Sequence, residues 1–102
     1  MNEGRFCHSS CTLGSKIYVY GGQNAEQNYL DTVEYLDMEY CKIWTSVKLD
    51  QLLARKNSHL CPLKDGEILI FGGHYEENKL QDISAFDVKD WNYRSQGTLN
   101  LI

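Results

Sequence analysis

The feature of this sequence that most constrains its fold is an internal repeat, because the second half of the chain echoes the first. Shifting the 102-residue chain by half its length places Ile17 on Ile68 and the glycine pair 21–22 on the pair 72–73. The other matches at this offset are His8 with His59, Val19 with Ile70, Tyr20 with Phe71, Glu26 with Glu77, Asp31 with Asp82 and Tyr35 with Phe86. Self-similarity at a fixed period is typical of repeat architectures, in which neighbouring units cover one another's apolar faces.

Each copy reads as four short strands separated by polar turns. The strands are expected at about residues 7–13, 16–22, 31–38 and 43–49, and again at about 58–63, 67–73, 82–88 and 91–102. β-branched and aromatic residues fill these segments, and Asp65-Gly66 is a hairpin signal between two apolar runs. Residues 49–56 look helical but are too few to form a stable helix alone. The sequence therefore predicts an all-β chain with one unit at 1–53 and a second at 54–102.

Composition and charge exclude several classes of protein. Hydrophobic residues make up 42% of the chain and charged residues 24%, as in an ordinary globular protein. The net charge of −4, without a basic stripe, argues against a nucleic-acid partner. No apolar run is long enough to span a membrane, and the first residues lack the pattern of a secretory signal. We therefore expect a cytoplasmic protein with reduced cysteines, unless a longer parent chain carries a signal upstream.

The repeated residues resemble the kelch motif over about residues 5–100. The first copy has Arg5, then His8, the segment KIYVYGG, the segment LDTVEYLD and finally Trp44. The second copy has Arg55 after a one-residue slip, His59, EILIFGG, LQDISAFD and Trp91. A glycine pair alone would be weak evidence, but here it recurs with the same flanking strand, aromatic residue and tryptophan. The second copy departs from the pattern in a shorter turn before its tryptophan and a loosely patterned end.

The resemblance implies a β-propeller in which each repeat is one four-stranded antiparallel blade. Glycine at a strand end suits a backbone with positive φ or a close neighbour. The resemblance also implies that Tyr20/Phe71, Tyr35/Phe86 and Trp44/Trp91 fill the space between blades, and that Arg5/Arg55 and His8/His59 hydrogen-bond between blades. Two blades cannot close a propeller of four to eight. A piece of a longer kelch protein, a ring assembled from several chains and a truncated product all remain open.

Cysteine and histidine residues invite a metal or catalytic interpretation, which their spacing does not favour. The segment Cys7-His8-x2-Cys11 and the pair His59 and Cys61 match no zinc-site spacing, so we expect the cysteines to be small buried hydrophobic residues. No third residue completes a nucleophile with its base. The glycine pairs lack the frame of a phosphate-binding loop. We therefore predict no catalytic residue, no metal and no cofactor.

The candidate binding residues lie in loops, since propellers bind through the connections at one rim. The loop between the second and third strands and the connection between blades should emerge on the same face, at residues 23–29, 50–56 and 74–79. The candidates on this face are Gln23, Asn24, Tyr29, Arg55, Lys56, His74 and Tyr75. Aromatic side chains and arginine are enriched at interfaces. The alternative for each residue is a solvated loop side chain without a partner.

The sequence thus predicts a non-enzymatic module that binds a protein or peptide partner through loops on one face. By analogy with the family, such propellers present substrates to ubiquitin ligases, contact the cytoskeleton or act as scaffolds. Two alternatives stay open. Some kelch-type propellers, such as galactose-oxidase-like enzymes, hold a copper site built from Tyr, His and Cys. The chain could also be a structural piece without a site of its own.

Overall fold

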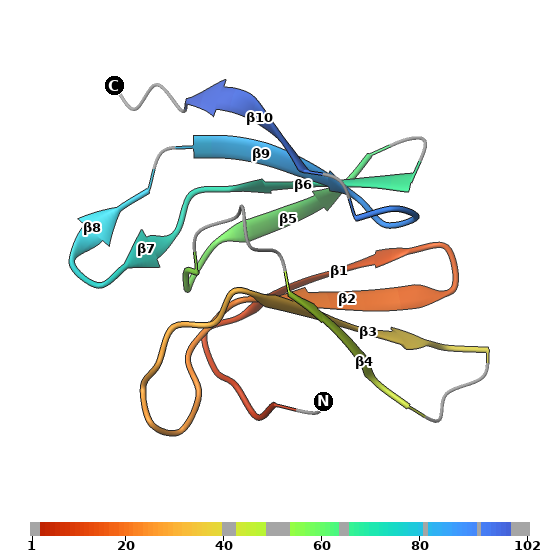
Figure 1. Ribbon diagram of the computed structural model, residues 1–102, viewed down its shortest axis with the longest axis horizontal. Coiled ribbons are helices and arrows are strands. Elements are labelled where there is room, and N and C mark those ends of the chain that lie inside the picture. The colour runs from red at the N-terminus through yellow and green to blue at the C-terminus, as the bar shows by residue number, and fades with distance from the viewer. Residues whose placement is uncertain are drawn as a thin grey trace.

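The computed structural model describes residues 3–39, 43–48, 54–63, 66–80, 82–91 and 93–98. Two antiparallel four-stranded sheets make up the fold (Figure 1). The first sheet holds β1 (Ser9–Leu13), β2 (Lys16–Tyr20), β3 (Thr32–Asp37) and β4 (Thr45–Lys48) in this order. The second holds β5 (His59–Pro62), β6 (Glu67–Phe71), β9 (Asp82–Asp87) and β10 (Tyr93–Thr98), with β5 and β10 at its edges. The predicted all-β class, with one four-stranded sheet per repeat, is confirmed.

A third, two-stranded element interrupts the second sheet. The strands β7 (His74–Tyr75) and β8 (Asn78–Lys79) form a short hairpin between β6 and β9. The sequence predicted only a polar loop there, because two-residue strands carry no periodic signal. The helical-looking stretch predicted at 49–56 lies mostly outside the described residues, and its described part, 54–56, contains no helix.

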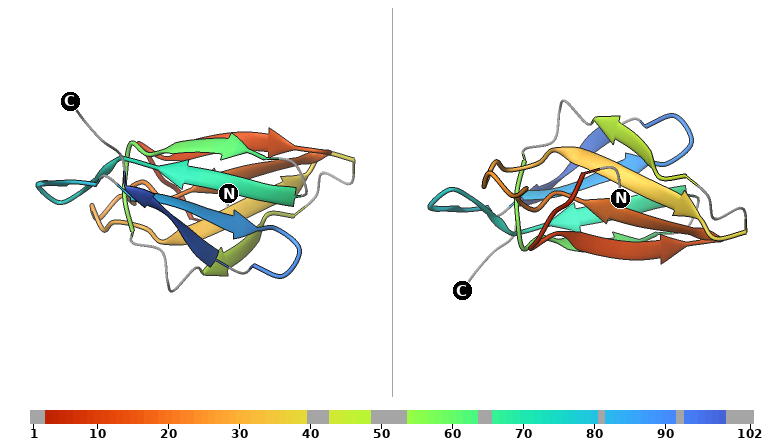
Figure 2. Two further views of the ribbon diagram at one scale, coloured as in Figure 1. Left: turned by 90° about the horizontal axis from the view of Figure 1, so that it is seen from above. Right: turned by 90° about the horizontal axis from the view of Figure 1, so that it is seen from below.

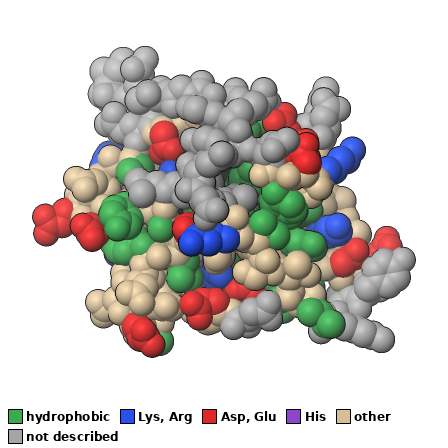
Figure 3. Space-filling view, viewed as in Figure 1, with side chains coloured by type: hydrophobic (Ala, Val, Ile, Leu, Met, Phe, Trp, Pro, Cys, Tyr) green, Lys and Arg blue, Asp and Glu red, His purple; other side chains and the backbone are tan. Residues whose placement is uncertain are grey.

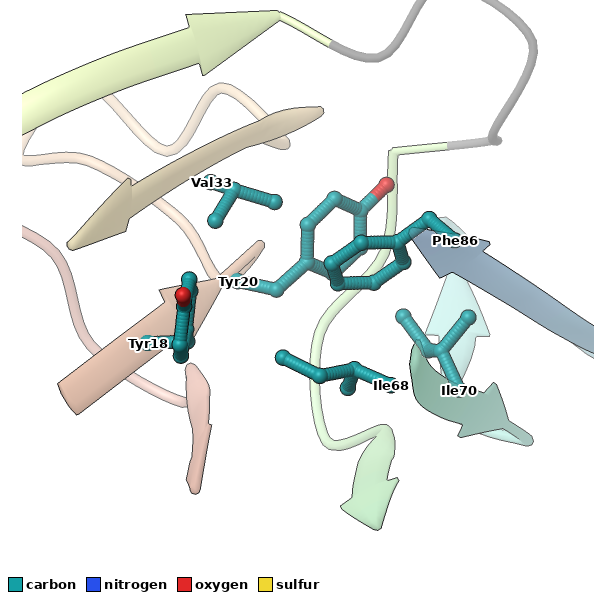
Figure 4. Packing of buried hydrophobic residues seen from close by; sticks show 6 residues of the cluster. All are labelled: Tyr18, Tyr20, Val33, Ile68, Ile70 and Phe86. Carbon is teal, nitrogen blue, oxygen red and sulfur yellow. The ribbon is translucent and has the colours of Figure 1, made fainter. Parts of the chain in front are cut away.

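The two sheets pack face to face, and the main core lies between them (Figures 1 and 2). The first sheet contributes Tyr18, Tyr20 and Val33, and the second contributes Ile68, Ile70 and Phe86 (Figure 4). These six side chains are at most 2% exposed. Two cross-sheet hydrogen bonds border the core near β1 and β5, the first strand of each sheet. The Ser9 and Ser58 hydroxyls are 3.0 Å apart, and the Asn57 N–H donates to the Cys7 carbonyl at 2.8 Å.

The first glycine pair fixes how closely the two sheets approach. Gly21 and Gly22 follow β2 with φ values of +71° and +89°, which only glycine adopts readily. The Gly22 N–H donates to the Arg55 carbonyl at 2.7 Å, so this backbone contact joins the sheets. A side chain at Gly21 would collide with the same Arg55 carbonyl oxygen. The repeated glycine is therefore required for docking as well as for turning the chain.

The two copies do not keep one offset along their whole length. Tyr20 pairs with Ser9 and Val33, whereas Phe71 pairs with His59 and Ile83. The strands on both sides of the second strand are therefore offset by 50 residues, while the second strand itself is offset by 51. Consequently His59 corresponds to Ser9 rather than His8, Asp82 to Thr32 rather than Asp31, and Phe86 to Leu36 rather than Tyr35.

Aromatic residues fill the seam between the sheets, as the resemblance implied, but not by equivalent positions. Trp91 of the second sheet lies with its ring centroid 5.8 Å from that of Tyr35, 6.3 Å from Tyr18 and 6.0 Å from Phe86. Tyr35 and Phe86 thus meet the same indole from opposite sheets. Phe71 instead stacks on His59 of its own sheet at 5.3 Å, away from this cluster.

Candidate functional site

Both repeat arginines lie inside the molecule, which corrects the expectation that Arg55 is a surface residue. Its side chain is 1% exposed, and its guanidinium donates to Asp82 at 2.7 and 2.8 Å and to the Gly72 carbonyl at 3.1 Å. These bonds, like those of Arg5 to Glu34 and Thr32, stay within one sheet. The arginine side chains therefore tie each sheet to its own first segment. Arg55 contacts the other sheet through its backbone carbonyl, which accepts a hydrogen bond from the Gly22 N–H.

The ion pair between Arg55 and Asp82 changes the pKa of the Asp82 carboxyl. Burial alone would raise the pKa of Asp82, but the hydrogen bonds and charge of Arg55 outweigh it and hold that pKa below its usual range. The Asp82 side chain is still 36% exposed, so water screens part of the interaction. The Arg55 guanidinium is thus buried and engaged with Asp82 of its own sheet.

Three described segments gather at one end of the two sheets and are called the loop face here: residues 23–29, 54–56 and 74–79. In Figure 1 they lie on the left, around the β7–β8 hairpin and the connection from β2 to β3. Backbone bridges pair Gln23 with Phe6 and with Tyr29, and Lys56 with His74. The described parts of the connections predicted to share a face, 23–29, 54–56 and 74–79, therefore lie at the same end of the sheets, and residues 50–53 lie outside the described residues.

The central feature of the loop face is a pair of tyrosines from different sheets. The rings of Tyr29 and Tyr75 are 5.1 Å apart, and the Tyr29 hydroxyl donates to the Glu76 carbonyl at 3.4 Å. The Lys56 ammonium lies 5.7 Å from the centre of the Tyr29 ring, a cation–π distance. A cleft of about 330 Å³ opens beside the pair, lined by Gln27, Asn28, Tyr29, Ala54, Tyr75 and Glu76.

The other predicted residues of this face divide by exposure. Gln23 is 8% exposed, and its side-chain amide donates to the Gln27 carbonyl at 3.1 Å, so it shapes the loop. The Asn24 side chain accepts bonds from the Glu26 and Asn28 backbones, both at 3.0 Å, in an Asx-type turn. His74 is exposed beside Tyr75. The binding role of all seven candidates stays a prediction, and Tyr29, His74 and Tyr75 lie together on the loop face.

Sequence reasoning missed Glu76, whose backbone carbonyl holds Tyr29 from across the seam. Glu76 and Gln27 have φ values of +55° and +66°, a backbone region that residues other than glycine seldom adopt. Neither glutamate nor glutamine is a residue type from which such a conformation can be predicted. The sequence signal for this contact is limited to two polar loops of nearly equal length, each with a single tyrosine.

The cysteines differ from the prediction of buried packing residues. Cys7 and Cys61 are exposed and Cys11 is half-buried, while Cys41 lies outside the described residues. Burial, with a smaller contribution from Cys61, raises the pKa of the Cys11 thiol to about 11. This thiol is therefore protonated at neutral pH and a poor nucleophile. Within the described residues no three His, Cys, Asp or Glu side chains are grouped to hold a metal ion.

None of the described segments forms a helix with the length and apolar character needed to cross a membrane.

A comparison with protein-family models matches residues 1–99 to the KLHDC2/KLHL20/DRC7 Kelch-repeats domain. Among curated proteins, an F-box/kelch-repeat protein of Arabidopsis thaliana is 30% identical over 81% of this chain and 30% of its own length. Kelch-like protein 36 of Bos taurus is 30% identical over 96% of this chain and 16% of its own length. The tRNA wybutosine-synthesizing protein 4 of Homo sapiens is 31% identical over 70% of this chain and 10% of its own length. The chain thus spans less than a third of each of these relatives.

Proposed function

This chain belongs to the kelch-repeat family, and on that premise we propose that it is a protein-interaction module that binds a partner protein or peptide through the loop face. The first sheet is one blade of the family's propeller and the second sheet is the next. The proposed role is binding without catalysis, in an adaptor or scaffold of the cytoplasm.

The observation that carries this proposal is the Tyr29–Tyr75 pair. Each ring comes from a different blade, so the surface they form exists only when the two blades are docked. Tyrosine offers a large apolar area with a polar tip and few rotatable bonds, which suits it to partner recognition. The adjacent cleft gives room for a side chain of the partner.

The named relatives support a binding role by analogy only. Two carry the word kelch in their names, one of them joined to an F-box, and the third is named as a synthesizing protein. One fold therefore occurs in proteins of different activity, and function has to be argued from the site. The loop-face tyrosines provide that site here.

Affinity capture from the source cell, with quantitative mass spectrometry, tests the proposal. We compare the wild-type protein with Tyr29→Ala, Tyr75→Ala and the double variant. Truncating a central aromatic residue of an interface costs about 2 kcal/mol or more, so partner recovery should fall at least tenfold. Circular dichroism verifies that each variant is folded.

Ile43→Ala is the matched control, because Ile43 is 76% exposed and precedes β4, whose first residue, Thr45, pairs with Tyr35 near the end of β3 that is farther from the loop face. Partner recovery with this variant should equal that of the wild type. The proposal fails if the folded double tyrosine variant recovers the same proteins in the same amounts as the control.

A further inference from the structure

The contact between the two blades, called the joint here, uses one face of each sheet. Hydrophobic side chains are exposed along the seam where the sheets meet in the view of Figure 3. A cleft of about 710 Å³ remains at the end of this seam away from the loop face, beside the turn from β1 to β2. Each sheet therefore has an inner face, which lies in the joint, and an outer face (Figure 2). The core of the joint consists of Tyr18, Tyr20 and Val33 from the first sheet and Ile68, Ile70 and Phe86 from the second.

The outer face of the second blade repeats the inner face of the first blade. The strand register makes Leu69, Phe71 and Ile83 equivalent to Tyr18, Tyr20 and Val33. These three residues alternate with core residues along β6 and β9, so their side chains point away from the joint. All three are half-buried, and in the described part of the chain no further sheet faces them. This face thus keeps the apolar character of a surface that packs on a blade.

The outer face of the first blade is its counterpart, because it repeats the inner face of the second. The strand register makes Ile17, Val19 and Leu36 equivalent to Ile68, Ile70 and Phe86. Ile17 and Leu36 are half-buried, and Val19 is buried. The two outer faces of one chain are therefore related to each other as the two sides of the existing joint are.

Charged groups do not oppose packing on these faces. Asp82 and Phe86 lie on the same face of β9, so the ion pair of Asp82 with Arg55 belongs to the inner face of the second blade. Arg5 and Glu34 hold the equivalent place on the outer face of the first blade, and both side chains are 0% exposed. Covering that face with another blade therefore buries a cation that is already neutralised.

Backbone hydrogen bonds also cross the joint. The Gly22 N–H donates to the Arg55 carbonyl at 2.7 Å, and the Asn57 N–H donates to the Cys7 carbonyl at 2.8 Å. The bridges from residue 6 to 23 and from 56 to 74 occupy the same place in the two blades, so residue 73 is equivalent to 22, and residues 5 and 7 to 55 and 57. Among the described backbone groups, none bonds the four equivalent groups, which are the Gly73 and Cys7 N–H groups and the Arg5 and Asn57 carbonyls.

The second glycine pair already has the conformation that the joint requires. Gly72 and Gly73 have φ values of +72° and +92°, close to the +71° and +89° of Gly21 and Gly22. In the first blade this conformation presents an N–H group to the neighbouring blade. The second blade thus presents a preformed donor, and preorganisation lowers the cost of association.

We propose that the outer face of the second blade binds the outer face of the first blade of a second copy of this chain. The Gly73 N–H then donates to the Arg5 carbonyl of the next copy, and the next copy's Cys7 N–H donates to the Asn57 carbonyl. The apolar contacts join Leu69, Phe71 and Ile83 to Ile17, Val19 and Leu36 of the next copy. Such a head-to-tail interface closes into a ring if the rotation between copies allows it. Roughly two to four copies complete a ring of four to eight blades.

Sedimentation velocity over a concentration series tests the proposal. The wild type should form a defined species that contains several copies of the chain. Leu69→Glu and Ile17→Glu each place a charge on one side of the new interface, so each should weaken self-association at least tenfold. Circular dichroism verifies that the variants are folded. Ile43→Glu is the matched control, because Ile43 is 76% exposed and lies outside the strands, and it should assemble as the wild type does.

An equimolar mixture of Leu69→Glu and Ile17→Glu distinguishes this interface from a symmetric one. Each variant keeps the face that the other has lost, so the mixture should form a heterodimer and stop there. Tyr29→Ala and Tyr75→Ala should assemble as the wild type does, since the loop face takes no part. Loss of assembly in these two variants would assign it to the loop face and overturn the proposal.

The proposal is also overturned if the wild type sediments as a single chain at every concentration. The outer faces would then be covered by further blades of a longer chain or by a different protein. It fails equally if the folded glutamate variants assemble as the control does, or if their mixture forms no heterodimer.

Discussion

The two buried arginines illustrate how single residues stabilise this fold. Removing a guanidinium from water costs several kcal/mol unless partners replace the lost hydration. Arg55 regains it from the two Asp82 carboxylate oxygens and the Gly72 carbonyl. Arg5 regains it from Glu34, in a pair whose side chains are both 0% exposed. Each arginine thus fixes the segment before the first strand to the third strand of the same blade.

Asp82→Asn should destabilise the protein in a pH-dependent way. At neutral pH we expect a loss of about 1–2 kcal/mol, below the 3–5 of a fully buried pair because Asp82 is partly exposed. The lowered pKa of Asp82 means that its contribution is complete above the unfolded pKa of about 3.9 and disappears as pH falls through the folded pKa. Urea unfolding between neutral pH and pH of about 2 should therefore show the wild type approaching the variant.

Glu77→Gln serves as the control, because Glu77 is an exposed residue of the neighbouring hairpin turn. It should leave the stability difference from wild type small at every pH. A gap between the wild type and Asp82→Asn that stays constant down to the acid limit would contradict the role assigned to the ionised carboxylate.

Sequence reasoning could identify these arginines as repeated residues but not place them. An arginine in a polar connection is expected to be solvated, since arginine is seldom buried without a partner. Its partner Asp82 lies 27 residues further along the chain, so no local pattern reveals the pair. The tyrosines of the loop face could be singled out from the sequence, because an aromatic residue in a polar loop has few structural reasons to be there.

At the scale of strands, the two blades place the carboxylate for their arginine differently. In β3, Thr32 and Glu34 both bond Arg5. In β9 the position equivalent to Thr32 is Asp82, which bonds Arg55, and the position equivalent to Glu34 is Ser84. The carboxylate has therefore moved by two residues along the third strand, on the same face of the sheet.

This exchange predicts that the acid can be moved within one blade. Asp82→Thr alone should lower the free energy of unfolding by about 2–3 kcal/mol, since it leaves Arg55 without its carboxylate. Adding Ser84→Glu recreates the arrangement of the first blade and should restore more than half of that loss. Chemical denaturation of the wild type, the single variants and the double variant measures the coupling.

The exchange model is wrong if the double variant is no more stable than the sum of its single variants predicts. Ser84→Glu alone is the informative reference, because it adds a second carboxylate beside Asp82 and should be destabilising by like-charge repulsion. The sign of the coupling free energy between positions 82 and 84 thus decides whether the carboxylate can be moved from one position to the other.

Strand positions were largely predictable from the sequence, and strand equivalences were not. The segments KIYVY and EILIF are rich in β-branched and aromatic residues and end at glycine pairs, so both strands were found where predicted. The offset changes by one residue in the turns on either side of these strands. A sequence match at one period therefore paired Tyr35 with Phe86, although the strand register makes Leu36 the equivalent of Phe86.

At the scale of the whole chain, Trp91 couples the two blades through its contacts with Tyr18, Tyr35 and Phe86. Trp91→Ala should lower stability by about 2–3 kcal/mol, less than for a fully buried tryptophan because the indole is half-buried. Hydrogen–deuterium exchange should show lower amide protection in β2 and β3 of the first blade as well as in β6 and β9.

The same measurement on Phe71→Ala is the comparison, because Phe71 stacks on His59 within the second blade. That variant should reduce protection mainly in the second blade. If Trp91→Ala likewise leaves β2 and β3 protected, the aromatic seam does not couple the blades.

The arrangement of whole blades was the level that the sequence predicted least. The sequence indicated that neighbouring units pack on one another, but it did not indicate which faces of the two sheets meet. The pairing of Tyr29 with Tyr75, and the cleft at the other end of the seam, arise only when two blades dock. The predicted division at residue 53 also stays a prediction, since residues 49–53 lie outside the described residues.

The displaced carboxylate has a consequence for engineering longer arrays from these repeats. A consensus sequence is built by choosing one residue independently at each aligned position. Here such a choice yields an arginine with two acids in half of the mixed combinations it creates and with none in the other half. Positions 32 and 34, or 82 and 84, must therefore be inherited together as one unit if a designed blade is to keep its buried cation neutralised.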